Sequence, residues 1–393
     1  MDTHTLCSLT VLKNLLKDDI ISSYNKALDE KFSLESLGQL YSYILDKNAE
    51  DGIFNYVCDI IIKDNNIFAL RASTEENLSD KLKNAYIRDL KILYHTAEDI
   101  VNAFKDNLHT LELDKGTANN LFIDKWSNTD TIDNLINFYR LNGFGDFAFF
   151  KAFKFSVDKL IPLKNTSNIT LNGLKEYVDE KKQISFNIEA FLKGLPFANM
   201  LLYGDKGTGK SSTVHAMLNN YFKKGLRLVE LPKSQIPDLI KLFEVLPKKP
   251  LKFIVFIDDL AMSDKEDNFS LLKAALEGSV TGLNKNIMVC ATSNRRHIIS
   301  ESFADRDNNV HFRDTMQEQL SLADRFGLAV LFDSPDKKLY LDIVYQLCTE
   351  NKIELDKEQL TLQAERFATL KGGRSPRRAK QFVDMLIAEQ GIN

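Results

Sequence analysis

The sequence predicts an α/β fold: a five-stranded parallel sheet flanked by helices, with a mainly helical domain before it and a helical lid after it. Two observations predict this arrangement. Short apolar runs alternate with segments of helix length through the middle of the chain, which is typical of right-handed β-α-β units. Apolar residues at helical spacing dominate both ends. The five runs of strand length are 198–203, 226–231, 253–257, 287–291 and 328–332.

The first part of the chain has the pattern of several short amphipathic helices. In 37–45 and in 82–94, apolar residues recur every three or four positions, and no glycine lies between Gly52 and Gly116. Pro162 and the polar residues that follow it are typical of a connection between domains. We therefore predict a mainly helical N-terminal domain over residues 1–165, whose role the sequence does not indicate.

The last part of the chain returns to helical periodicity after the fifth apolar run. Three helices are predicted, over 337–351, 356–370 and 375–390. They lead us to divide the remainder of the chain into an α/β core at 166–334 and a helical lid at 335–393.

Composition limits the classes of function. The chain has 393 residues, enough for two or three domains. The chain contains 51 Lys and Arg and 55 Asp and Glu, so its net charge is −4. Any contact with a polyanion therefore has to be local. The four cysteines form no CxxC pair, which favours reduced thiols in a cytoplasmic protein. Because no run of 18 apolar residues occurs, we expect no association with a membrane.

The strongest motif is GDKGTGKSS at 204–212, which fits the pattern GxxxxGK[ST]. Its glycines let successive backbone amides point into one concavity, at the N-terminus of the helix that follows. Lys210 is expected to reach the β- and γ-phosphates of a nucleotide, and the Ser211 hydroxyl to bind Mg²⁺. The predicted ATP-binding residues of this loop are Gly204, Asp205, Lys206, Gly207, Thr208, Gly209, Lys210, Ser211 and Ser212.

Acidic and polar residues end two later strands. KFIVFIDDL at 252–260 places Asp258 and Asp259 at the carboxyl edge of the sheet, where ligands of parallel sheets bind. We expect Asp258 to hold Mg²⁺ through water and Asp259 to orient or deprotonate an attacking water. Asn294 ends the run at 286–294 and is predicted to hold the same water, although helix capping by Ser293 or Asn294 is nearly as plausible on local grounds.

Basic residues stand out at two further places. Arg325 lies just before the fifth strand, where a single arginine is more often a surface charge or an ion-pair partner. Five basic residues without an acid fall within 371–380, and this basic cluster is a candidate for a local nucleic-acid patch. Its members are Lys371, Arg374, Arg377, Arg378 and Lys380.

Together these motifs resemble those of the AAA+ ATPases, over about residues 168–390 and in the family order. GDKGTGKS is similar to the Walker A loop, FIVFIDD to Walker B, and ATSN to sensor 1 with Asn294. ADRFGL resembles the box that carries the arginine finger, here Arg325. SPRRAKQF resembles sensor 2, best matched by Arg377 with Arg378 as the alternative. LNGLKEY resembles the element that packs near adenine.

The resemblance implies a substrate, a metal and an assembly. AAA+ ATPases bind ATP with Mg²⁺ and usually form rings in which the finger of one subunit completes the site of its neighbour. We therefore expect a homo-oligomer, in a ring or partial ring. Many members carry Asp-Glu in Walker B, whereas this chain has Asp259, whose carboxylate is retracted by about 1.3–1.5 Å for want of one methylene. Intrinsic hydrolysis is therefore expected to be slow, and to depend on assembly or on a partner.

A closer resemblance is to a bacterial AAA+ family described as a domain of unknown function, number 815, which implies no particular substrate. It rests on FIDDLAM, CATSNRRH, DTMQEQLSLADRFGL and GGRSPRRAKQFVD. The RFGL box and the paired aspartates are also similar to those of bacterial replication initiators and helicase loaders. The DNA-binding helix-turn-helix of the initiators is not expected, because the sequence ends at Asn393, directly after the lid.

Three functions follow from these patterns. The first is an oligomeric ATPase that hydrolyses MgATP to remodel or load a protein or nucleic-acid client. The alternative is a nucleotide-gated DNA-binding or helicase-loader-like protein with little intrinsic hydrolysis, for which the basic cluster, the paired aspartates and the initiator-like RFGL box are the evidence. The third, a small-molecule P-loop kinase, is disfavoured because its chemistry needs neither the separate sensor and finger positions nor the helical lid.

Overall fold

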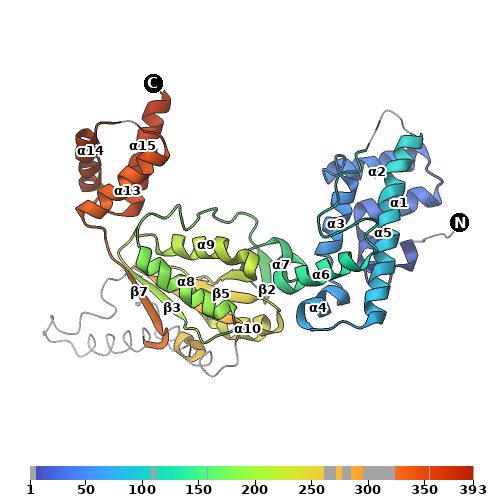
Figure 1. Ribbon diagram of the computed structural model, residues 1–393, viewed down its shortest axis with the longest axis horizontal. Coiled ribbons are helices and arrows are strands. Elements are labelled where there is room, and N and C mark those ends of the chain that lie inside the picture. Colours follow the sequence, from blue (N-terminus) through green and yellow to red (C-terminus); the bar gives the residue numbers. More distant parts are fainter. Residues whose placement is uncertain are drawn as a thin grey trace. The chain divides into compact units, whose positions relative to one another are not determined.

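The computed structural model describes residues 6–107, 111, 113–156, 158–260, 271–276, 285–294, 324–353 and 355–392. The chain divides into two compact units, Met1–Phe150 and Lys151–Asn393, and each is considered by itself (Figure 1). Within the described ranges, no helix combines the length and the apolar character that crossing a membrane requires.

The first unit is helical, as its periodicity predicts. Side chains accept backbone N–H groups at the start of four helices, where intrahelical partners are missing: Asp18, Ser33, Asn66 and Asn128 cap α1, α2, α4 and α6. The elements are η1 (Leu6–Ser8), η2 (Lys13–Lys17), α1 (Asp19–Asp29), α2 (Leu34–Asp46), α3 (Ile53–Lys63), α4 (Ile67–Thr74), α5 (Asp80–Asn107), α6 (Thr129–Asn142) and α7 (Asp146–Phe149).

The core of the first unit is aromatic and closes around Trp126. This side chain is fully buried, and its ring meets those of Phe54 and Phe122 edge to face, with 5.3 Å between centroids in each case. The buried Asp89 of α5 accepts the backbone N–H groups of Thr10, Val11 and Leu12 at 2.7–3.0 Å, which ties the start of the described chain to this core. The first unit therefore has a core of its own.

The second unit contains a seven-stranded sheet in the order β2-β1-β4-β5-β6-β3-β7. The five predicted strands are all present and mutually parallel, so the predicted α/β fold is confirmed. Two further strands extend the sheet: β1 pairs parallel with β4, and β2 pairs antiparallel with β1. The strands are β1 (Ala152–Ser156), β2 (Lys159–Pro162), β3 (Met200–Gly204), β4 (Leu226–Glu230), β5 (Lys252–Ile257), β6 (Ile287–Ser293) and β7 (Leu328–Phe332).

These extra strands place the division between the units at Phe150/Lys151, about 15 residues before the predicted 165/166. Phe153 and Phe155 of β1 are buried, and the strand joins the sheet through β4, so it belongs to the second unit. Pro162, interpreted as part of a connection, is the last residue of β2. Because β2 lies at the edge of the sheet, the missing N–H of a proline breaks no pairing there.

Helices α8 (Val178–Leu192) and α9 (Lys210–Tyr221) cover one face of the sheet (Figure 1). Ile188 of α8 and Met217 of α9 share a core with Leu202, Leu228 and Met288 of three strands. Further helical elements of the sheet region include η3 (Phe222–Lys224), η4 (Lys233–Asp238), α10 (Leu239–Val245) and η5 (Leu246–Lys248), and residues 271–276 are also helical.

Three helices follow β7 and correspond closely to the predicted lid: α13 (Lys337–Glu350), α14 (Lys357–Leu370) and α15 (Pro376–Ile392). They pack around Tyr340, Val344 and Phe382. The predicted division between core and lid, 334/335, falls in the connection from β7 to α13.

Candidate nucleotide-binding site

The glycine-rich loop follows the carboxyl end of β3, between β6 and β7 in the sheet, and α9 begins directly after it at Lys210. Gly204, Gly207 and Gly209 have φ values of +126°, +86° and +97°, which only glycine adopts readily. A Cβ at Gly204 would lie 2.2 Å from the carbonyl oxygen of Phe332, so a side chain there would force β3 away from β7. The loop thus has the strand-to-helix geometry that the motif predicts.

Lys210 is the first residue of α9, and its side chain turns back to the loop that precedes the helix. Its Nζ donates hydrogen bonds to the carbonyl oxygens of Gly204 at 2.9 Å and Asp205 at 2.6 Å, and the residue is 5% exposed. Burial lowers the pKa of Lys210 to about 8, against the opposing effect of nearby carboxylates that include Asp205 and Asp258. A phosphate placed beside this ammonium would favour its charged form.

The predicted magnesium residues meet at a single carboxylate oxygen. Asp258 Oδ1 accepts hydrogen bonds from Ser211 Oγ and from Thr292 Oγ1, each at 2.6 Å. Thr292 Oγ1 in turn accepts the backbone N–H of Asp259 at 2.8 Å, which joins the ends of β5 and β6. Mg²⁺ prefers oxygen ligands and keeps several of its waters. The neighbouring carboxylate and hydroxyl oxygens of Asp258 and Ser211 therefore suit this metal.

Asp259 and Asn294, the predicted catalytic pair, lie in direct contact. Asn294 Nδ2 donates to Asp259 Oδ1, and Lys233 Nζ donates to Oδ2 at 3.3 Å. Asp259 itself has a φ of +55°, an uncommon conformation for a residue with a side chain. Both carboxylate oxygens are therefore held by neighbours.

Three cavities adjoin the loop, and two of them lie at the predicted phosphate and adenine sides. A cavity of about 210 Å³ lies over the phosphate side and is lined by Lys210, Ser211, both aspartates, Thr292, Asn294 and Arg377. A second cavity, of about 450 Å³, lies between the loop, the lid and residues 168–177, which include the predicted adenine-side element LNGLKEY. Its volume is in the range of small-ligand sites.

The lid contacts the loop directly at Gly207. The backbone N–H of Arg377 donates to the Gly207 carbonyl oxygen at 3.2 Å, and Arg377 lines both cavities. Arg378 lines neither of these two cavities, and its Nη1 donates to Gln381 Oε1 at 2.8 Å. It does line the third cavity, of about 630 Å³, which lies between the loop and the lid and which Arg377 also lines. Of the two sensor 2 candidates, Arg377 thus lies beside the predicted phosphate site.

The other members of the basic cluster include two with partners inside the lid. Arg374 forms a two-pronged contact with Glu365, at 2.9 and 2.6 Å, and this contact lowers the pKa of Glu365. Lys380 Nζ contacts both carboxylate oxygens of Asp384, at 3.0 and 3.1 Å. Both side chains thus have an ion-pair partner inside the lid, while Lys380 also lines the 450 Å³ cavity.

Arg325 is exposed and lies two residues before Gly327, whose φ is +66°. The next residue, Phe326, is fully buried and anchors this segment just before β7. Arg325 lines neither cavity of its own chain. Four segments carry the closer family resemblance, and residues 314–323, 261–262 and 295–297, which belong to three of them, lie outside the described residues.

A family model described as "Protein of unknown function (DUF815)" matches residues 148–390, more than half of the chain. The chain belongs to the DUF815 family. The family predicted from the motifs is thereby confirmed. The DUF815 match begins within three residues of the division between the two units, so it covers the second unit and almost none of the first.

Several solved structures are similar to part of this chain. A mutant RuvB from Thermotoga maritima has 16% identity and a TM-score of 0.38, with 56% of this chain and 67% of that chain covered. A second Thermotoga maritima RuvB, described as a Holliday junction branch migration motor, has 14% identity and a TM-score of 0.34, with 56% and 72% covered. The FIGL-1 AAA domain in complex with ADP has 18% identity and a TM-score of 0.38, with 55% and 72% covered. No curated protein matches the sequence significantly.

Two residues of this DUF815 site escape prediction from the sequence. Thr292 is recognisable as a polar strand end, but its place between Asp258 and Asp259 emerges only from the structure. Lys233 follows the carboxyl end of β4 by three residues, but a single lysine there forms no motif, so its contact with Asp259 also emerges only from the structure.

Proposed function

We propose that this chain is an AAA+ ATPase that binds MgATP between the glycine-rich loop and the lid and hydrolyses it. The observation that carries the proposal is the meeting of Ser211 and Asp258 at 2.6 Å, in a cavity also lined by Asp259, Asn294 and Arg377. Segments that the motifs single out far apart in the sequence thus converge on one space.

In this proposal the loop and the first aspartate bind the phosphates and the metal. The Lys210 ammonium and the loop amides hold the β- and γ-phosphates at the start of α9. Ser211 and Asp258 hold Mg²⁺, the aspartate through water. When bound, Mg²⁺ neutralises charge on the phosphate oxygens.

Asp259 and Asn294 hold the attacking water, with Asp259 accepting its proton. The shorter aspartate and the contacts of both its oxygens with Asn294 and Lys233 support slow hydrolysis in the single subunit. A change in those contacts on assembly or on client binding would release the carboxylate for this role.

Arg377 is assigned as the lid residue that senses the γ-phosphate. Arg377→Ala is expected to weaken MgATP binding about 10-fold, the typical cost of losing a hydrogen bond to a charged group. Arg378→Ala is the matched control and should bind within about twofold of the wild type, because its guanidinium contacts Gln381 instead. Titration calorimetry measures both, and the reverse order of effects would move the assignment to Arg378.

The proposed assembly is a homo-oligomer, in a ring or partial ring, in which Arg325 acts on the site of the neighbouring subunit. The client is an unidentified protein or nucleic acid. The alternative of a DNA-binding protein with little hydrolysis is less well supported, because Arg374 and Lys380 of the basic cluster contact Glu365 and Asp384.

The proposal is tested by Asp259→Asn. Removing the base should leave MgATP affinity within about threefold of the wild type and lower turnover about 100-fold, at the lower end of general-base effects because this carboxylate is retracted and held. Phosphate release and nucleotide binding are measured in parallel, with Asp179→Asn, an exposed change in the first turn of α8, as the control. Turnover unchanged by Asp259→Asn would contradict the role of base. The ATP-loaded variant also provides a trap from which the client can be identified by co-purification.

A further inference from the structure

Residues 167–177, termed here the arm, form one wall of the 450 Å³ cavity. The arm connects the β1–β2 hairpin to α8 and contains no helix or strand. Ile169, Leu174 and Tyr177 of the arm line the cavity together with Ile343 and Leu347 of the lid. Since the arm lacks regular secondary structure, its position depends on side-chain contacts at its two ends.

The start of the arm is held by Asn219, near the end of α9. Asn219 Nδ2 donates to the carbonyl oxygens of Ser167 at 2.7 Å and Ile169 at 2.9 Å. Lys151 Nζ donates to Asn219 Oδ1 at 2.9 Å and so orients the amide. The helix that begins at the phosphate loop therefore also fixes the beginning of the cavity wall.

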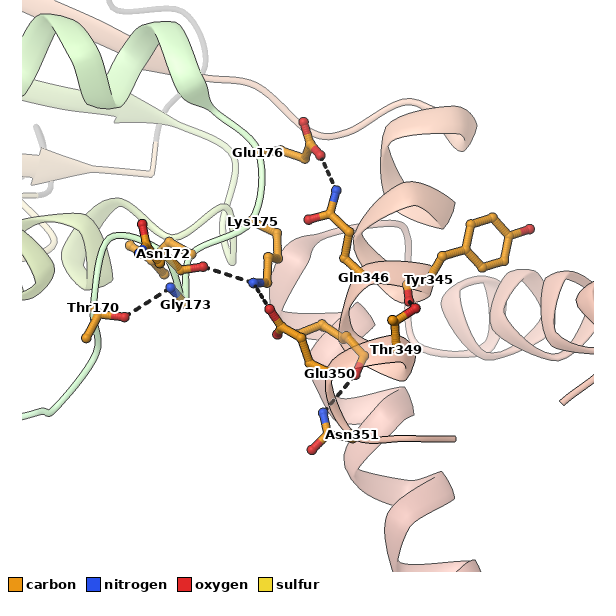
Figure 2. A network of polar contacts seen from close by, with 12 residues as sticks. Thr170, Asn172, Gly173, Lys175, Glu176, Tyr345, Gln346, Thr349, Glu350 and Asn351 are labelled. Atoms are coloured by element: carbon orange, nitrogen blue, oxygen red, sulfur yellow. Dashed lines mark hydrogen bonds and ion pairs between the residues drawn. The ribbon is translucent and has the colours of Figure 1, made fainter. Parts of the chain in front are cut away.

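The end of the arm is held by the lid (Figure 2). Lys175 Nζ donates to the Asn172 carbonyl oxygen at 2.9 Å and forms an ion pair with Glu350 of α13. One position along, Glu176 Oε1 accepts a hydrogen bond from Gln346 Nε2 at 2.8 Å. The Lys175 side chain is only 12% exposed, while that of Glu350 is 54% exposed, so the lysine is the member that has little freedom to leave.

The backbone at this end of the arm is strained. Glu176 and Tyr177 have φ values of +59° and +54°, although neither is glycine. Such conformations persist where the surroundings impose them, and they cluster at ligand clamps. Here the Tyr177 hydroxyl donates to the Asp333 carbonyl oxygen at 2.6 Å, and its ring stacks on Phe332 at 5.3 Å between centroids. The arm is thus locked to the segment that links β7 to the lid.

We infer that Lys175, Glu176 and Asn219 are positioning residues for the nucleoside part of the nucleotide, and that the contact between arm and lid couples recognition of the base to the position of the lid. The inference rests on the proposed function. At the phosphate side of the site, the lid has a separate contact with the glycine-rich loop, the hydrogen bond from the Arg377 backbone N–H to the Gly207 carbonyl oxygen. Loosening the arm therefore affects ligands that carry a base more than ligands that consist of phosphate alone.

A charge-swap series on the full chain tests the coupling. Lys175→Glu, Glu350→Lys and the double variant are titrated with ATP and with inorganic tripolyphosphate, both with Mg²⁺. Lys175→Glu should weaken ATP binding about 10-fold, since it places a nearly buried carboxylate beside Glu350. Glu350→Lys should cost about threefold, because this exposed side chain can turn to solvent. The double variant should recover ATP affinity to within about threefold of the wild type, and tripolyphosphate affinity should stay within about twofold throughout.

Two controls keep the result specific. Lys352→Glu reverses an exposed charge just after α13 and should leave both affinities unchanged. Asn219→Ala should weaken ATP binding without affecting tripolyphosphate, whereas Asn220→Ala at its exposed neighbour should affect neither. Equal losses for both ligands, or no recovery in the double variant, would overturn the inference. A wild-type chain that binds neither ligand would instead refute the proposed function.

Discussion

MgATP binding is expected to fall about 100-fold or more when Lys210 is replaced by alanine, with hydrolysis lost at ordinary nucleotide concentrations. The substitution removes a buried ammonium at the start of α9, and each hydrogen bond between charged groups contributes about 1.5–3 kcal/mol. Since the lysine is predicted to contact two phosphates, two such contacts are lost together. Titration calorimetry measures the change, with Lys223→Ala, an exposed change in η3 just after α9, as the control.

The pH dependence of binding provides an independent check on Lys210. The pKa of this lysine is about 8, so its charge is complete well below pH 8 and is lost as the pH rises above it. Because phosphate binding requires the ammonium, wild-type affinity should fall above pH 8, by up to about tenfold per pH unit. The Lys210→Ala variant should lack this decline. Unchanged ATP affinity in Lys210→Ala would contradict the assignment of the loop.

Replacing Arg325 with alanine is expected to leave MgATP binding intact and to lower turnover about 1,000-fold in the assembled protein, the lower end of the range for arginine fingers. The exposed Arg325 lines neither cavity of its own chain, so its proposed target is the neighbouring site. Phosphate release measured over a series of protein concentrations separates assembled from dilute subunits. Arg366→Ala, an exposed change in α14, should behave as the wild type.

Mixing subunits distinguishes action on the neighbour from action within one chain. A subunit with Arg325→Ala retains Asp259, and a subunit with Asp259→Asn retains Arg325, so a complete site forms where the two meet. In a randomly mixed equimolar ring with head-to-tail contacts, about one quarter of the sites are complete, and about one quarter of wild-type turnover should return. No recovery under conditions that permit mixed assemblies would refute action between subunits.

Strands β3, β5 and β6 are predictable because each is dominated by a continuous apolar run, buried on both faces of a parallel sheet. The hairpin of β1 and β2 is not recognisable in the sequence as part of that sheet. In β2, exposed and half-buried residues alternate at the edge, so no apolar run marks the strand. The two buried phenylalanines of β1 come directly after the aromatic residues of helix α7, so the sequence does not show where helix ends and strand begins. Only the pairing with β4, about 75 residues later, identifies the strand.

In the site, too, residues that belong to local sequence motifs are predictable, and residues that act through distant contacts are not. The loop, the two aspartates and Asn294 are predictable, because the chemistry of each depends on a motif of adjacent residues at the end of a strand. Lys233 and Asn219 are not, since their roles arise only from folding: Lys233 meets Asp259 across 26 residues, and Asn219 meets Ser167 across 52. Neither residue type at those positions carries a pattern of its own.

The separate cores of the two units have a consequence for the evolution of the chain. The buried cluster of the first unit ends at Tyr139, and the clusters described in the second begin at Ala152 and Tyr340. The family match likewise begins at residue 148. A destabilising substitution in one core is therefore expected to be offset most readily by repacking within the same core. Under the proposed function, the constraint from nucleotide binding falls on the second unit, and each unit adds the constraint of its own packing.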